Sequence, residues 1–455
     1  MKRYFIILGV IVAIAAVAVI GLFIWKQFGS AAPGSVGTGT TGSLPSTGTQ
    51  GSSGGTSGGT NTGGSGSTGS SSDAGQTNVP GGPGIVAGSF GSLSNDPVLA
   101  YAVLPTNTVM ALEPNGVVAT ITNGQTSYLS SSTAANVIGG SFSADGKKAL
   151  LTFNANSNVP QTSIFDVSSS KWTALPQGME SPVWSPVKGD SRIAYFAEGK
   201  SGTETLSTID TANPKKSPVN LLTLHANDLT IQWVGPTQFI LADKGTDYTP
   251  GSILSFDSSQ GTITPVTTDI FGLETLWSTV SKNNPTLGLL FIAGNGGVGG
   301  SLQLINAAKG TPQSLAVTTL PAKCGFGLAT STVPAAAATS TGANAATSTG
   351  GTAKTTSTAT AAAPASTNYL ALFCGIPHDQ NALSLAHLPD DYNQMALFTS
   401  DDIYEINTQN GAITVLWSTT SQHMDVTDVS TVGGAVFFIN RYDNKLYTFT
   451  VQQSQ

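Results

Sequence analysis

Histidine and carboxylate side chains gather in one polar stretch near the carboxyl end of the chain. His378, Asp379 and His387 are followed by the pair Asp390 and Asp391. Imidazole and carboxylate together could hold a divalent cation or move a proton. Their spacing matches no established ligand pattern. A solvated loop is therefore the better interpretation, and we predict no catalytic residue, no metal site and no cofactor.

Other segments resemble motifs for phosphate binding or catalysis, but each lacks residues that its motif requires. The glycine-rich run 294–300 (GNGGVGG) has no Lys-Ser/Thr and no helix after it, and the run 198–201 (EGKS) lacks the upstream glycine of a phosphate loop. Both runs are predicted to be hairpins. No serine sits in a Gly-x-Ser-x-Gly elbow. Asp401 and Asp402 could touch a cation, but a turn that enters a strand explains them better.

Net charge limits the classes of partner. Of 18 basic residues, Lys2, Arg3 and Lys26 flank the first apolar run, which leaves 15 against 25 acidic residues in the rest of the chain. A nucleic-acid-binding protein would need a basic face. Adhesion to anionic lipid head groups would also need positive charge. The composition therefore argues against both.

The N-terminal segment predicts a membrane anchor. Residues 4–25 contain no charge over 22 positions, which as a helix spans about 33 Å, enough for the hydrocarbon core. Basic residues precede this run, so residues 1–3 are predicted to be cytoplasmic and everything after Lys26 extracytoplasmic. A cleaved signal peptide is the alternative, with GSAAPG as the cleavage site. Residues 26–83 are Gly, Ser and Thr almost throughout and predict a disordered linker.

An aromatic residue recurs about every 45 positions in residues 84–455, followed by an acidic or amide turn residue. The aromatics, which we interpret as blade-core residues, are Phe90, Phe142, Trp184, Trp233, Trp277 and Phe326. The turn residues are Glu113, Asp166, Asp210, Asp257, Asn306 and Asn407. A fixed period of this size indicates supersecondary units that bury their faces on one another.

Each unit contains short apolar runs rich in β-branched and aromatic residues, separated by Gly, Asn, Asp and Pro. In the second unit VIGGSF, KKALLTF, TSIFDV and KWTALP predict four consecutive strands. Four antiparallel strands repeated radially form a propeller blade. The fold class is therefore all-β, a β-propeller of seven four-stranded blades, with six or eight as alternatives. The last unit lacks a fourth strand, which either comes from the N-terminal side or is missing.

Two stretches, FSADGKKALLTF and WSPVKGDSRIAYF, resemble the WD40-like repeat of TolB-type propellers, which also occurs in prolyl-oligopeptidase propeller domains. The resemblance spans residues 86–325 and 369–451. It implies a propeller fold and a bacterial cell envelope, and almost nothing about activity. Nothing in the chain resembles the hydrolase domain that accompanies the oligopeptidase propeller.

A second low-complexity block, residues 329–367, interrupts the sixth blade between its first and second strands. Cys324 and Cys374 flank this block on neighbouring antiparallel strands. Two cysteines in an exported chain are more often bridged than free. We therefore predict a disulfide that clamps the base of the insert, with two buried thiols as the alternative.

We interpret the protein as a membrane-anchored, extracytoplasmic propeller that binds an envelope protein, a peptide or a glycan without catalysis. By analogy with other propellers, the face opposite the insert should carry binding. The candidate contact residues on that face are His378, Asp379, His387, Asp390, Asp391 and Tyr392. A passive surface spacer or adhesin is one alternative, and a glycan hydrolase or lyase is another.

Overall fold

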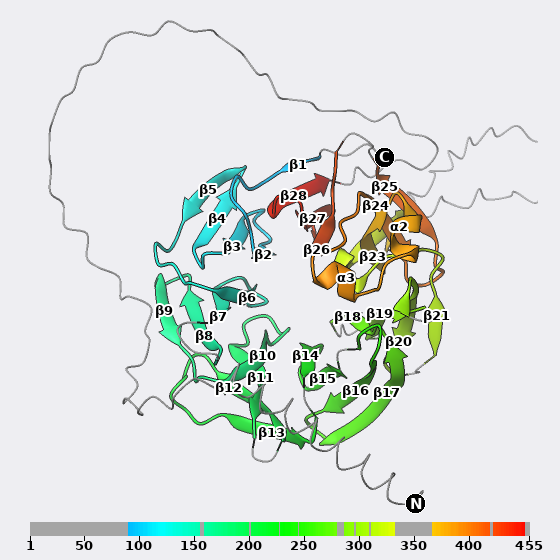
Figure 1. Ribbon diagram of the computed structural model, residues 1–455. Helices are drawn as coiled ribbons and strands as arrows, with labels where there is room; N and C mark the ends of the chain where they lie inside the picture. Colours follow the sequence, from blue (N-terminus) through cyan, green and yellow to red (C-terminus); the bar gives the residue numbers. More distant parts are fainter. Residues whose placement is uncertain are drawn as a thin grey trace, which may run out of the picture. The chain divides into compact units, whose positions relative to one another are not determined.

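The computed structural model describes residues 90–154, 159–199, 202–226, 228–243, 245–279, 286–294, 297–308, 311–332, 366–418 and 422–450. They form seven four-stranded sheets arranged as the blades of a ring (Figure 1). The predicted all-β propeller with seven blades is confirmed. The predicted anchor (residues 4–25), the whole predicted linker (residues 26–83) and most of the insert lie outside the described residues. No helix among the described residues is long and apolar enough to cross a membrane.

The first six blades each use four consecutive strands, so every sheet is a meander. Blade 1 contains β2 (Ala100–Val103), β3 (Val109–Leu112), β4 (Val118–Thr122) and β5 (Gln125–Tyr128). Blade 2 contains β6 (Val137–Phe142), β7 (Lys148–Phe153), β8 (Gln161–Asp166) and β9 (Lys171–Ala174). Blade 3 contains β10 (Met179–Trp184), β11 (Arg192–Glu198), β12 (Glu204–Asp210) and β13 (Val219–Leu224).

The second half of the ring continues in the same way. Blade 4 contains β14 (Leu229–Trp233), β15 (Gln238–Asp243), β16 (Pro250–Asp257) and β17 (Thr262–Phe271). Blade 5 contains β18 (Glu274–Trp277), β19 (Leu287–Ala293), β20 (Gly300–Asn306) and β21 (Pro312–Ser314). Blade 6 contains β22 (Cys324–Thr332), β23 (Ser366–Pro377), β24 (Asp401–Asn407) and β25 (Ile413–Trp417). The 3-10 helix η2 (Pro321–Lys323) leads into β22.

Blade 7 joins the two ends of the described chain. It contains β26 (Val426–Val432), β27 (Ala435–Asn440), β28 (Lys445–Thr450) and, as its outermost strand, β1 (Phe90–Ser92). In the antiparallel pair of β1 and β28, Phe90 lies opposite Phe449. The missing fourth strand therefore comes from the N-terminal side, one of the two alternatives that the sequence left open.

This closure corrects the assignment of Phe90. The period placed Phe90 in a first strand, but Phe90 lies in a fourth strand and blade 1 begins with β2. Its partner Glu113 consequently follows the second strand of blade 1, whereas Asp166 ends the third strand of blade 2. The repeat pattern is therefore displaced by one strand at the N-terminal end, because β1, the first described strand, belongs to the last blade.

The later repeat aromatics lie in the interior of the ring. Trp184, Trp233 and Trp277 are buried, and Phe142 and Phe326 are half-buried. Trp277 packs against the second strand of its own blade at Gly288, where a Cβ atom would stand 2.6 Å from the indole ring. A glycine is needed at this position because any side chain would displace the tryptophan.

Strand direction divides the loops between two faces. Because consecutive strands are antiparallel, the connections between strands 2 and 3 and those between blades share one face, which we call the upper face. The connections between strands 1 and 2 lie on the opposite, lower face. The insert between β22 and β23 is therefore on the lower face, and residues 378–400 between β23 and β24 are on the upper face. Both strands extend into the predicted insert: β22 reaches Thr332, and β23 begins at Ser366.

The predicted disulfide is confirmed. Cys324 and Cys374 are directly opposite in the pair of β22 and β23, and their sulfur atoms are bonded. The bond closes a loop with a sequence separation of 50 residues. Both cysteines lie in the core shared by blades 5 and 6. The disulfide therefore joins β22 to β23, the two strands between which the long insert lies in the sequence.

Replacing both cysteines with serine (Cys324→Ser and Cys374→Ser) should lower the free energy of unfolding by about 2–4 kcal/mol, because the unfolded chain regains the freedom of the closed loop. Urea unfolding with and without a reductant measures this change. The reductant should weaken the parent protein by a similar amount and leave the double variant unaffected. Equal stability of the variant and the oxidised parent would show that the bond does not constrain the unfolded chain.

Candidate functional site

Residues 378–400, which we call the excursion, form the largest described structure on the upper face. The excursion contains α2 (Gln380–Ser384) and α3 (Asp390–Asn393), and the Asp379 carboxylate caps α2 by accepting a hydrogen bond from the Asn381 amide. Leu383, Leu388 and Tyr392 are buried in the core of blades 5 and 6. The expectation of a solvated loop is therefore wrong: the segment is packed on three apolar side chains.

The excursion also contacts three other blades, and α3 lies toward the middle of the ring (Figure 1). The Gly299 amide of blade 5 donates to the Ala386 carbonyl at 2.9 Å. Asp247 of blade 4 pairs with His387 at 2.9 Å. Arg441 of blade 7 donates to the Tyr392 carbonyl at 2.7 Å. The segment is thus held at several points, which makes it a rigid platform.

A buried ion network lies beneath this platform. The Lys323 ammonium contacts the Asp401 carboxylate at 2.6 Å and also bonds to Asp425, and the side chains of all three residues are wholly buried. Arg441 donates to the second oxygen of Asp425 at 2.8 Å. Burial opposes the charge on Lys323, but the carboxylates of Asp401 and Asp425 outweigh it and raise the pKa of the ammonium above its usual value.

Tyr392, one of the contact residues that the sequence suggested, is buried between the two cations of this network. The Arg441 guanidinium lies 3.7 Å from the centroid of the Tyr392 ring, and the Lys323 ammonium lies 5.0 Å from it. Cation–π contacts of this kind are strongest when both groups are desolvated. They connect α3 to η2 and to blade 7.

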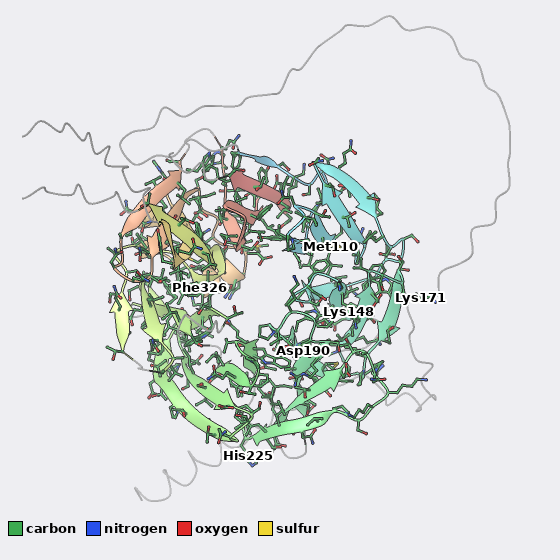
Figure 2. All side chains as sticks on the ribbon, turned by 180° about the vertical axis from the view of Figure 1, so that it is seen from behind. Met110, Lys148, Lys171, Asp190, His225 and Phe326 are labelled. Carbon is green, nitrogen blue, oxygen red and sulfur yellow. A yellow bond between two sulfur atoms is a disulfide. The ribbon has the colours of Figure 1, made fainter. Side chains whose placement is uncertain are left out.

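All four histidines lie in connections of the upper face, and three of them are paired through Nδ1. His378 contacts Asp402 at 3.2 Å, and His387 contacts Asp247 at 2.9 Å. His423 contacts the Ser400 hydroxyl at 3.0 Å. The fourth histidine, His225, lies at the outer edge of the ring (Figure 2).

The candidate carboxylates of the excursion join the same pairs. Asp391 accepts from the His387 amide at 2.8 Å, and Asp390 accepts from the Asp247 amide at 3.3 Å. The structure thus divides His378 and His387 between two separate pairs. Within the described part of the chain, no group of three or more His, Cys, Asp or Glu side chains could hold a metal ion.

Exposed apolar side chains gather beside the ion network. The aromatic patch consists of Met395, Phe398, His423 and Tyr442. Met395, Phe398 and Tyr442 are exposed by 54%, 38% and 47% of their surfaces. The rings of Phe398 and Tyr442 have centroids 5.4 Å apart. The guanidinium carbon of Arg441 lies 4.8 Å from the centroid of the Phe398 ring. The patch is therefore made of large side chains backed by buried ion pairs.

An acidic pocket opens on the other side of α3. It has a volume of about 350 Å³ and lies between the inner strands β14 and β18, where it is lined by Asp243, Glu274 and Asp390. Burial raises the pKa of all three carboxyls. The pKa of Glu274 rises to about 7. Glu274 accepts one hydrogen bond, from the Ala322 amide at 2.8 Å.

Sequence reasoning missed the ion network, the aromatic patch and the acidic pocket. Lys323 and Asp425 are 102 positions apart, and no motif relates them. The only signal for part of the network was the pair Asp401–Asp402, which did suggest contact with a cation. The cation is the chain's own Lys323.

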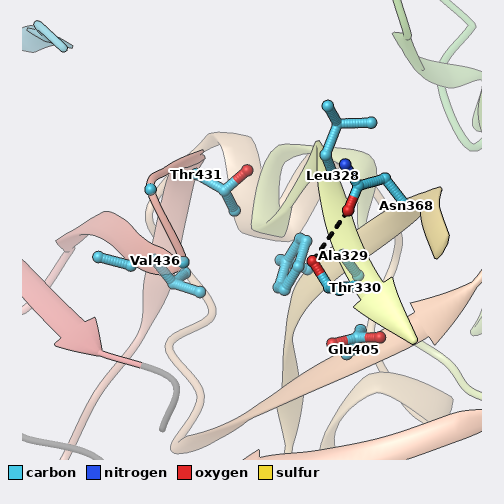
Figure 3. Close-up of a pocket in the computed structure, with 11 residues that line it drawn as sticks. Leu328, Ala329, Thr330, Asn368, Glu405, Thr431 and Val436 are labelled. Carbon is cyan, nitrogen blue, oxygen red and sulfur yellow. Dashed lines mark hydrogen bonds between the residues drawn. The ribbon is translucent and has the colours of Figure 1, made fainter. Parts of the chain in front are cut away.

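The lower face has a cleft of about 460 Å³ between blades 6 and 7, near the root of the insert. Its walls include Leu328, Asn368 and Thr431 (Figure 3). Thr330 donates a hydrogen bond to Asn368 at 3.0 Å across the pair of β22 and β23. The cleft contains a single carboxylate, Glu405, which already bonds to the Tyr369 hydroxyl. It offers an apolar wall and few free polar groups.

The predicted hairpins with glycine-rich or lysine-containing turns are also confirmed as connections. Residues 294–300 join β19 to β20, and the EGKS run joins β11 to β12. Asp401 and Asp402 open β24, as predicted.

Comparisons with known proteins find solved structures that are similar only at low sequence identity. No protein-family model matches the chain, and no curated protein matches it. Oligogalacturonate lyase in complex with manganese is similar with a TM-score of 0.48 and 10% identity, over 81% of this chain and 94% of that chain. The propeller domain of the trilobed protease from Pyrococcus furiosus gives 0.41 and 10%, over 76% and 93%. The GH74 enzyme of Niastella koreensis gives 0.45 and 12%, over 79% and 44%.

Proposed function

We propose that the protein is a membrane-anchored, extracytoplasmic binding module that contacts a polypeptide of the cell envelope through its upper face. The observation that supports this proposal most directly is the aromatic patch on a rigid base. Three large apolar side chains are exposed together there, although the chain could have placed polar residues at these positions. Exposed apolar clusters of this kind commonly mark interaction sites.

The base beneath the patch favours binding over a passive role. Arg441 underlies Phe398 and is itself fixed to the buried Asp425. Side chains that are already ordered lose less conformational entropy when a partner binds. Aromatic and arginine residues also supply most of the energy at protein interfaces. A passive spacer or adhesin, in which only the length of the tract matters, would not need this arrangement.

A glycan hydrolase or lyase is the second candidate, because Glu274 has the environment of a general acid. Its raised pKa of about 7 would keep a proton available near neutral pH. Against this candidate, the Oε2 atom of Glu274 is enclosed within the protein, whereas a general acid must reach the oxygen it protonates. Non-catalytic binding therefore accounts better for the geometry.

Replacing Phe398 and Tyr442 together with alanine should weaken partner binding at least about thirtyfold, the factor that corresponds to the loss of about 2 kcal/mol from a single hot-spot residue. Crosslinking in intact cells, followed by mass spectrometry, would identify the partner, and the purified pair would give the affinity. Exchanging the whole excursion for a flexible linker is a poorer test, because it would remove the buried Leu383, Leu388 and Tyr392.

Tyr128→Ala is the matched control for this experiment. Tyr128 is also an exposed aromatic, at 57%, but it lies on the outer strand of blade 1. A discrete partner that persists with Tyr128→Ala and disappears with the double variant supports the proposal. A partner retained equally by both variants would place binding elsewhere, and a phenotype that follows only the length of residues 26–83 would favour the spacer.

A further inference from the structure

Positive charge gathers on one part of the ring. Seven of the ten lysines and arginines in the described part of the chain lie on the lower face of blades 2 and 3, at the connections between strands 1 and 2 and between strands 3 and 4. We call them the basic patch: Lys147, Lys148, Lys171, Lys188, Arg192, Lys215 and Lys216. Lys148 lies toward the middle of the ring and Lys171 at its outer edge (Figure 2). The other three are Lys323 and Arg441, which are buried, and Lys445 on the upper face.

Hydrogen bonds between the turns make the basic patch one continuous surface. The Lys148 ammonium of blade 2 donates to the Thr211 hydroxyl of blade 3 at 2.9 Å. Thr211 begins the connection that contains Lys215 and Lys216, and its amide donates to the Ser191 carbonyl at 3.0 Å. Ser191 lies in the neighbouring connection between β10 and β11. The cations of the two blades therefore belong to turns that are joined to one another.

Carboxylates of the same turns are recessed and already engaged. Four aspartates share this surface: Asp145, Asp166, Asp190 and Asp210. Each accepts a hydrogen bond from a nearby serine hydroxyl, at 2.6–2.8 Å. The side chain of Lys147 is exposed by 77% and that of Asp145 by 15%, and the values for Arg192 and Asp190 are 46% and 15%. Seven cations and four carboxylates leave a net charge of +3, and the outermost charges are positive.

Acidic residues elsewhere in the ring do not cancel this positive charge. Most of them lie on the upper face, among them the three carboxyls of the acidic pocket. Strands of six and seven residues, such as β7 and β11, separate the two faces, a distance of about 20 Å at about 3.3 Å per residue. The Debye length at physiological ionic strength is about 8 Å, so the solvent screens one face from the other. The net charge of the chain, which argued against contact with anionic lipid, sums two faces of different character.

We propose that the basic patch lies against the anionic phospholipid head groups of the membrane in which the protein is anchored, an inference that rests on the proposed function. Clusters of about four to eight lysines and arginines are attracted to anionic lipid surfaces. Val187 is exposed beside Lys188 in the same turn, and apolar side chains next to basic ones are typical of surfaces that lie among lipid head groups.

The direction of β1 favours a lipid surface over a soluble acidic partner. As the fourth strand of blade 7, β1 runs from the lower to the upper face, so a chain anchored through residues 4–25 enters the ring on the lower face at Phe90. A tether makes contact with the bilayer intramolecular, and a weak attraction per lysine is then sufficient. The upper face, with the aromatic patch, is directed away from the bilayer and toward the polypeptide partner.

The test compares the full-length protein in nanodiscs of phosphatidylcholine with the same protein in nanodiscs that also contain about 30% phosphatidylglycerol. Acetylation by a water-soluble reagent, followed by mass spectrometry, measures the accessibility of each lysine. Lys188, Lys215 and Lys216 should react at least about threefold more slowly when phosphatidylglycerol is present. The difference should disappear in about 0.5 M salt, where the Debye length falls to about 4 Å. Lys445 on the upper face is the internal control and should react equally in both.

A charge-removing variant tests whether the patch itself makes the contact. In the triple variant Lys188→Gln, Lys215→Gln and Lys216→Gln, the remaining Lys147 should react at the same rate with both lipids. Lys445→Gln is the matched control and should leave the effect of phosphatidylglycerol unchanged. Slow reaction of Lys147 that persists in the triple variant would overturn the inference, as would equal reactivity of the patch lysines of the parent protein in both nanodiscs. Protection that depends on protein concentration instead of lipid would assign the patch to a second copy of the chain and overturn it as well.

The outcomes separate this inference from the proposed function. A crosslinked partner that is lost with Phe398→Ala and Tyr442→Ala, without any effect of lipid on the basic patch, would leave the proposed binding function standing and refute the membrane contact. Protection of the basic patch by phosphatidylglycerol, without any polypeptide partner, would do the reverse. Full-length protein that does not enter either nanodisc would refute the anchor, and with it the membrane contact.

Discussion

Replacing Lys323 with methionine should lower the free energy of unfolding by about 3–5 kcal/mol, the usual cost of leaving a buried charge without its partner. The ammonium contacts Asp401 and Asp425, whose side chains have no exposed surface. Methionine is of similar length, so the variant removes the charge with little change in packing. Urea unfolding at pH 8, followed by tryptophan fluorescence, measures the difference.

The pH dependence of this variant provides a check on its cause. Burial already raises the pKa of Asp401, and Lys323 opposes this rise, so removing the ammonium should raise the pKa of Asp401 further. An acid whose pKa is higher in the folded chain than in the unfolded chain lowers the free energy of unfolding at pH values above its unfolded pKa. This cost disappears when the pH falls below the unfolded pKa. The deficit of Lys323→Met should therefore shrink as the pH falls from 8 toward 4. Adding Asp425→Asn should recover part of the loss at pH 8.

A stability of Lys323→Met equal to that of the parent at pH 8 would contradict the network as described. Glu198→Gln serves as a control, since the removal of an exposed charge should change stability by less than about 0.5 kcal/mol. The network also holds Arg441 beneath Phe398. Loss of stability in Lys323→Met should for this reason be accompanied by greater mobility of the aromatic patch.

The blades were predictable from sequence because each is a local structure. Strands of the first six blades follow one another along the chain, so alternating apolar runs and turn residues report them directly. The same locality made the Cys324–Cys374 pair predictable, because both cysteines lie on neighbouring strands of one hairpin. Phe90 was misplaced because its strand pairs with the other end of the chain, at Phe449. The distance in sequence from Phe90 to Phe142 is close to the repeat period only by chance.

The candidate site was predictable only in outline. The polar composition of residues 378–394 drew attention to a segment that lies on the upper face. Its packing could not be foreseen, because Leu383, Leu388 and Tyr392 follow neither a helical nor a strand period. The acidic pocket combines side chains from blade 4, blade 5 and α3. The packing of α3 on blades 4 and 5 brings them together, and no spacing in the chain records that contact.

Removing β1 should be the most damaging change to the ring itself. A chain that begins at residue 96 lacks the outer strand of blade 7 and exposes the edge of β28. It also lacks Phe90, whose ring stacks on Trp417 of blade 6 with centroids 4.5 Å apart. Phe90→Ala alone should cost about 2–3 kcal/mol, below the range for a fully buried phenylalanine because Phe90 is half-buried. The truncation should cost more, since the ladder bonds to β28 are lost as well.

Thermal unfolding and sedimentation test this prediction together. The truncated chain should melt at least 10 °C below one that begins at residue 84, and it should self-associate, because an unpaired edge strand is a template for pairing. Adding a peptide of residues 84–95 should restore monomers and raise the melting temperature. An unchanged melting temperature would mean that three strands suffice to close blade 7.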